Sequence, residues 1–159
     1  MNRVILLLII CGIGVGSCKM SSKTTTGYSP GLSSDDYSNW NKLTGKWYGT
    51  MDSKDGRSEW LTERNPDGTY VIQFKITDKT GTIDKIVESG EWGLSGNIFF
   101  TTFKYSGVGD TKSPVDATDP YNRDAYKILK LDENSFKYEH VRTGIKLEAQ
   151  KVDRDFILK

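Results

Sequence analysis

The segment Thr69-Tyr70-Val71-Ile72-Gln73-Phe74-Lys75-Ile76-Thr77 carries the alternation that decides the fold. Its even-numbered positions are large and apolar, whereas Gln73 and Lys75 are polar, so an extended strand here has one apolar face and one solvated face. The preceding Asn65-Pro66-Asp67-Gly68 has the residue types of a hairpin turn, and it follows a second alternating segment, 57–64. These residues predict an antiparallel hairpin whose apolar face covers a core.

The same period of two continues on both sides of this hairpin. Short turn sequences separate most of the segments, and no helical segment alternates with them, which argues against a parallel sheet. We expect an all-β fold, an eight-stranded antiparallel up-and-down β-barrel, because closure removes the exposed edges of such a meander. The predicted strands are 46–52, 57–64, 69–77, 82–93 with a bulge at Gly90, 98–105, 124–131, 135–142 and 145–152.

Two further segments complete the predicted domain, 35–159. Residues 35–43 begin with two acids and then place apolar side chains every third position, which predicts a short helical turn ended by Gly45. The segment 106–120 has no apolar period and exceeds the usual loop length, which indicates a lid or a loop at the rim of the barrel.

The N-terminus combines one positive charge with a run of apolar residues. Arg3 precedes an apolar run that ends in Val15-Gly16-Ser17-Cys18, and this ending resembles the bacterial lipobox. The resemblance implies that 1–17 is a signal peptide, that Cys18 carries lipid, and that the Ser- and Thr-rich residues 18–34 form a flexible tether. Lys19 follows Cys18, which by resemblance to enterobacterial sorting rules favours the bacterial outer membrane, facing the periplasm.

The composition argues against several classes of function. The chain has 22 basic and 21 acidic residues, which removes the electrostatic argument for nucleic-acid binding. Cys11 leaves with the signal peptide and Cys18 is lipidated, so no thiol remains. A single His and the absence of a nucleophile elbow or phosphate loop predict no metal site, no cofactor and no enzyme activity. Three strand acids are interpreted as solvated, outer-face residues: Glu63, Glu88 and Glu91.

The residues Gly45-Lys46-Trp47-Tyr48 resemble the Gly-x-Trp signature that opens the first strand of the lipocalins. The resemblance implies a small lipocalin-like lipoprotein in which Gly45 and Trp47 close one end of the barrel and Arg154 lies on the Trp47 ring. The sequence departs from the family in two ways: the long helix after the last strand is missing, and Thr118-Asp119-Pro120-Tyr121 lies one strand too early for the second signature. Ligand identity is therefore not implied.

The inward faces of the strands give the candidate ligand-binding residues. These are Trp60, Tyr70, Phe74, Trp92, Tyr138, His140 and Arg142. Because Lys137 and Glu139 belong outside, the face of 135–142 that carries His140 and Arg142 turns inward. These two side chains either pair with acids or phenols such as Glu91 or Tyr126, or meet the anionic head of a ligand such as a fatty acid at the mouth.

Two functions follow from an eight-stranded barrel of this kind. Its interior either holds a small apolar or amphipathic ligand, or is filled by side chains, in which case the protein is a structural or interaction module for another envelope component. A continuous interior cavity lined by aromatic side chains separates the two hypotheses. The sequence predicts a membrane-anchored protein in both cases, and names no protein partner.

Overall fold

The computed structural model describes residues 34–108 and 111–159. The predicted signal peptide, the lipidation site Cys18 and the tether up to residue 33 lie outside the described residues. The elements are α1 (Ser34–Leu43), β1 (Gly45–Ser53), β2 (Gly56–Arg64), β3 (Thr69–Asp78), β4 (Ile83–Ser95), β5 (Ile98–Val108), β6 (Thr111–Pro114), the 3₁₀ turn η1 (Pro120–Asn122), β7 (Arg123–Leu131), β8 (Ser135–His140) and β9 (Lys146–Val152).

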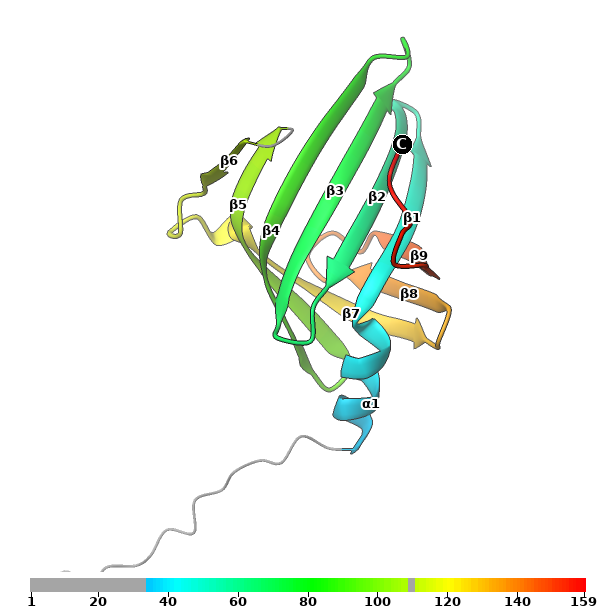
Figure 1. The fold of residues 1–159 in the computed structure, drawn as a ribbon, viewed down its shortest axis with the longest axis vertical. Coiled ribbons are helices and arrows are strands. Elements are labelled where there is room, and N and C mark those ends of the chain that lie inside the picture. Colours follow the sequence, from blue (N-terminus) through cyan, green and yellow to red (C-terminus); the bar gives the residue numbers. More distant parts are fainter. Residues whose placement is uncertain (1–33, 109–110) are drawn as a thin grey trace, which may run out of the picture. The chain divides into compact units, whose positions relative to one another are not determined.

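Eight of these strands close into an antiparallel barrel. The strands β1 to β5 each pair with the next strand in the chain (Figure 1). β5 also pairs with β7, β7 pairs with β8, and β8 pairs with β9. The pairing of β9 with β1 closes the ring, with Trp47 opposite Lys151 and Gly49 opposite Ala149. The predicted fold class, including the short helix before the first strand, is confirmed.

The segment 106–120 differs from its prediction as a loop without strands. β5 runs on to Val108, and the short strand β6 pairs back on it, with Tyr105 opposite Pro114 and Val108 opposite Thr111. β6 has the sequence Thr-Lys-Ser-Pro and is exposed along its whole length, so it shows no alternation of apolar and polar residues. The chain then returns through η1 to β7, which pairs with the other end of β5.

Two glycines explain local departures from regular strands. The β4–β5 register shifts between Ser89 and Gly90, which confirms the predicted bulge, and a side chain at Gly90 would overlap the backbone of β5. β8 ends at His140, earlier than predicted, because the chain turns there. The His140 carbonyl accepts from the Gly144 N–H at 2.8 Å, and Gly144 has a φ of 69°.

One end of the barrel is closed by α1 and by Trp47, which is 1% exposed. Its indole Nε1 donates to the Leu43 carbonyl at 2.9 Å, and its ring meets Phe136 edge-on. Beside it, Trp40 of α1 stacks on Trp92 with ring centroids 4.0 Å apart. Through these aromatic contacts, α1 packs against the hydrophobic core.

The cation over the Trp47 ring is the Lys151 ammonium, and Arg154 does not take the position predicted for it. The Lys151 Nζ lies 5.2 Å from the ring centroid and donates to the Lys42 carbonyl at 2.9 Å. Lys151 reaches the ring because it is the partner of Trp47 in the β1–β9 ladder. Arg154 lies beyond the end of β9 and is exposed.

Candidate functional site

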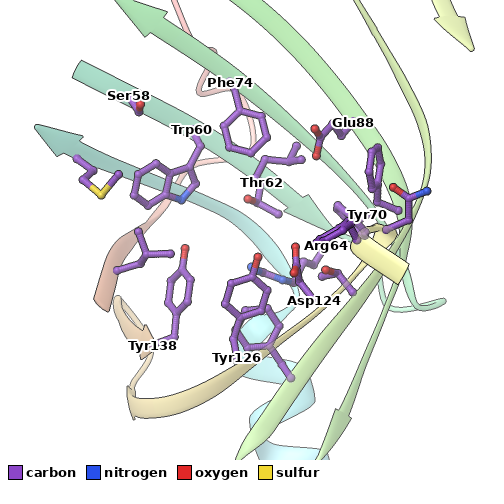
Figure 2. A pocket seen from close by; sticks show the side chains of 18 of the residues that line it. Ser58, Trp60, Thr62, Arg64, Tyr70, Phe74, Glu88, Asp124, Tyr126 and Tyr138 are labelled. Carbon is purple, nitrogen blue, oxygen red and sulfur yellow. The ribbon is translucent and has the colours of Figure 1, made fainter. Parts of the chain in front are cut away.

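A cavity of about 510 Å³ lies inside the barrel, lined by inward side chains of β1 to β5, β7 to β9 and η1 (Figure 2). The alternation of the strands explains which residues reach it. On β2, Trp60, Thr62 and Arg64 line the cavity, whereas the residues between them point away from it. On β5 the lining residues are Phe99, Thr101 and Phe103, and Phe100 is 43% exposed on the outer face.

The wall formed by β2 and β3 changes in character along its length. Across the two strands the pairs run from the closed end outward as Arg64–Tyr70, Thr62–Ile72, Trp60–Phe74 and Ser58–Ile76. All eight side chains line the cavity. The cavity is therefore polar and aromatic beside the closed end, and mainly apolar farther along the strands.

Arg64 is the most unusual residue of the site. It ends β2, is only 6% exposed, and its Nε and Nη1 atoms are buried without a hydrogen-bond partner among the described residues. Its guanidinium carbon lies 5.1 Å from the Phe99 ring centroid and 5.7 Å from that of Phe136. Burial lowers the pKa of Arg64, but a guanidinium keeps its charge in proteins, so the site holds a buried positive charge.

Three tyrosines surround this charge, and all three are neutral at pH 7. Burial raises the pKa of Tyr138 to about 12, and it raises the pKa of Tyr70 and Tyr126 further above the ordinary value. Tyr126 stacks on Phe99 with ring centroids 4.5 Å apart and meets Tyr138 edge-on. In Figure 2 the Tyr126 and Tyr138 side chains lie side by side and point into the cavity. Their phenol groups can donate hydrogen bonds there.

Two acids also line the cavity, Glu88 and Asp124. The interpretation of Glu88 as a solvated outer-face acid is wrong, because the β4 register turns it inward opposite Ile72. Burial raises the pKa of Glu88, and the negative charge of Asp124 raises it further. The other two acids of that interpretation do not line the cavity, and Glu91 pairs with Lys104.

Asp124 is held by the two basic residues predicted for the inner face of 135–142. The Asp124 Oδ1 accepts from Arg142 Nη2 at 2.6 Å and lies 2.9 Å from His140 Nε2. The His140 Nδ1 accepts the Thr143 backbone N–H at 3.2 Å, so in the neutral ring the proton is on Nε2 and is donated to Asp124. Arg142 also lies 4.8 Å over the Tyr121 ring. For His140 and Arg142 the sequence left open either pairing with an acid or a phenol, or binding of a ligand's head group. In the structure they pair with an acid, and that acid is Asp124 and not Glu91.

The structure divides the predicted site residues into two groups. Trp60, Tyr70, Phe74 and Tyr138 line the cavity. Trp92, His140 and Arg142 do not: Trp92 packs at the closed end, and its Nε1 donates to the Asn65 carbonyl at 3.1 Å. Sequence reasoning missed Arg64, although the spacing of two from Trp60 and Thr62 places it on the same face.

No family model and no curated protein matches the chain. Among solved structures, the crystal structure of a lipocalin-like protein from Bacteroides uniformis is similar, with a TM-score of 0.44 and 16% sequence identity. The similarity covers 70% of this chain and 99% of that one.

In the described ranges, no helix is long and apolar enough to cross a membrane.

Proposed function

We propose that this chain is a binding protein, a lipoprotein of the bacterial cell envelope whose barrel holds one small apolar or amphipathic ligand. The observation that carries the proposal is the interior cavity of about 510 Å³. Ligand pockets typically measure about 300–1,000 Å³ and are lined by apolar and aromatic side chains with a few polar groups. The cavity has this composition.

The alternative function, a barrel filled by side chains that serves as a structural or interaction module, is less well supported. A filled barrel needs its inward side chains to meet at the barrel axis. Here Trp60 and Phe74 line an open space instead. The polar groups inside this space, from Arg64, Glu88 and three tyrosines, carry a desolvation cost that a purely structural core avoids with apolar side chains.

Membrane anchoring is part of the same proposal and is supported by the sequence alone. Cys18 closes a lipobox-like sequence after a charged and then apolar segment. The mature chain carries as many acidic as basic side chains, so lipid on Cys18 would hold it without a basic patch. Such a protein would sit in the outer membrane and sample ligands in the periplasm.

The first experiment asks whether the purified full chain carries a small molecule, by native mass spectrometry. We expect an added mass that is lost on denaturation. A cavity-filling variant, Thr101→Trp, should lose the bound mass, whereas Thr102→Trp, on the next residue of β5 and the opposite face, should keep it. An empty wild type that also fails to bind added apolar and amphipathic probes would reject the binding function.

A further inference from the structure

The starting point is the pair of unpaired guanidinium nitrogens of Arg64. An arginine carries five N–H donors and no acceptor, and leaving such donors buried without partners costs free energy. A buried polar group without a partner therefore calls for an explanation, and a role toward a ligand is one such explanation. The faces of the Phe99 and Phe136 rings stabilise part of the Arg64 charge through cation–π interactions. Aromatic rings do not replace the oxygen acceptors that the Arg64 N–H groups need for full hydrogen bonds.

The surroundings of Arg64 contain no carboxylate that neutralises it. Among the described residues Arg64 takes part in no ion pair, and the three tyrosines near it, Tyr70, Tyr126 and Tyr138, are neutral at pH 7. Asp124 is held by Arg142 and His140 instead, and Glu88 is influenced by Asp124. The closed end of the cavity therefore has a positive charge without a counter-charge.

On this basis, and resting on the binding function proposed above, we infer that the ligand is an amphipathic monocarboxylate that enters the barrel head first. Its carboxylate binds the Arg64 guanidinium, with the phenol groups of Tyr126 and Tyr138 as additional donors. Its apolar tail extends along the β2–β3 wall, past Trp60 and Phe74 and toward Ile76. This arrangement differs from the alternative drawn from the sequence, in which Arg142 binds the head group.

The charge of the cavity favours a monoanion. One unpaired arginine matches one carboxylate, which it binds through charge-assisted hydrogen bonds. Glu88 and Asp124 add negative charge to the same cavity, and they would repel a doubly charged phosphate more strongly than a carboxylate. An uncharged ligand can accept hydrogen bonds from Arg64 but leaves its charge without a counter-charge.

The test compares octanoate with octan-1-ol, which has the same chain length without the charge. The full chain is placed in nanodiscs, empty nanodiscs give the blank, and binding is followed by tryptophan fluorescence and calorimetry. For the wild type we expect octanoate to bind about tenfold or more tightly than octan-1-ol, the value of a charge-assisted hydrogen bond. Arg64→Met should remove this preference by weakening octanoate alone.

Two control variants carry the same substitution elsewhere. Arg57→Met lies on the same strand, outside the cavity and paired with Asp52, and should retain the preference. Arg142→Met tests the alternative anchor: if it abolishes the preference while Arg64→Met retains it, the head group binds at Arg142 and the inference is wrong. A shift of the Arg64 Nε–H signal in nuclear magnetic resonance spectra on adding octanoate should accompany binding.

Stability separates a ligand-binding Arg64 from a structural one. Because its charge is unpaired, Arg64→Met should melt at the same temperature as the ligand-free wild type or higher. A lower melting temperature together with unchanged octanoate binding would assign Arg64 to packing and overturn the inference. Equal binding of octanoate and octan-1-ol by the wild type would also overturn it and leave the binding function intact. Binding of neither probe, in a chain that also carries no ligand, would reject both.

Discussion

The Nη2 atom of Arg142 lies 2.6 Å from Oδ1 of Asp124, so the arginine expected at the head of a ligand already has its counter-charge in the barrel wall. The same oxygen lies 2.9 Å from His140 Nε2. This arrangement ties the turn after β8 to the start of β7. It leaves Arg64 as the cation of the cavity wall without a carboxylate partner among the described residues.

The Asp124–Arg142 pair should contribute little to stability. The Arg142 side chain is 43% exposed, and solvent-exposed ion pairs typically contribute about 0.2–1 kcal/mol. Chemical denaturation of Asp124→Asn, Arg142→Met and the double variant forms a double-mutant cycle, which should give a coupling free energy in this range. A coupling of several kcal/mol would mean that the pair behaves as a buried one.

Trp47 should be among the residues on which stability depends most. It is 1% exposed, donates to the Leu43 carbonyl and packs against Phe136. Trp47→Ala should lower the free energy of unfolding by about 3–5 kcal/mol, through lost burial and the cavity left behind. Tyr37→Ala, an aromatic truncation on the exposed part of α1, is the control and should cost far less. Equal melting temperatures for Trp47→Ala and the wild type would contradict the closure of the barrel by this residue.

The sequence was sufficient for the fold because its strands alternate and most of its turns are short. Turn residues such as Asn65-Pro66-Asp67-Gly68 separate runs of period two, so the strand boundaries follow with small errors. The segment 106–120 was mispredicted because β6 is exposed on both faces and has no apolar side to reveal it.

The candidate site was less predictable because alternation gives the face of a residue but not its height in the barrel. Trp92 and Tyr70 both belong to inward faces, yet the stagger between strands places Trp92 under Trp40 and only Tyr70 in the cavity. Arg64 was missed for a different reason. Charged residues are normally solvated, so the alternation that places Arg64 on the same face as Trp60 does not by itself predict a buried charge.

Glu88 should make stability depend on pH. Its pKa is raised in the folded protein by burial and by Asp124, so the folded state holds this proton more tightly than the unfolded chain. The free energy of unfolding contributed by Glu88 therefore falls as the pH rises above its ordinary value of 4.5 toward the raised value. Glu88→Gln removes this loss, so the melting temperature of the variant relative to the wild type should rise across that window. Glu63→Gln, outside the cavity, is the control. If the melting temperatures of Glu88→Gln and the wild type change in parallel with pH, the prediction is wrong.

Cys18 should be required for attachment to the membrane. The prediction follows from Val15-Gly16-Ser17-Cys18 and concerns residues outside the described ranges. Cys18→Ser should abolish labelling of the protein by radioactive palmitate, because the sulfur that accepts diacylglycerol is gone. Cys11→Ser, inside the expected signal peptide, is the matched control and should label normally. Labelling of Cys18→Ser at the wild-type level would remove the lipid anchor from the proposed function.

Gly49 should control the width of the cavity through Trp60. The two residues are partners in the β1–β2 ladder, and a methyl group at position 49 would overlap the Trp60 indole and lie 2.7 Å from the Glu148 carbonyl oxygen. Gly49→Ala should therefore push the indole into the cavity, lower the free energy of unfolding by about 1–3 kcal/mol and weaken binding of octanoate and octan-1-ol alike. Gly93→Ala is the control: its methyl would meet the ring of Phe100, which is 43% exposed on the outer face and can move into solvent. Denaturation and probe titration on both variants measure the difference, and equal effects on binding would show that Trp60 does not shape the ligand site.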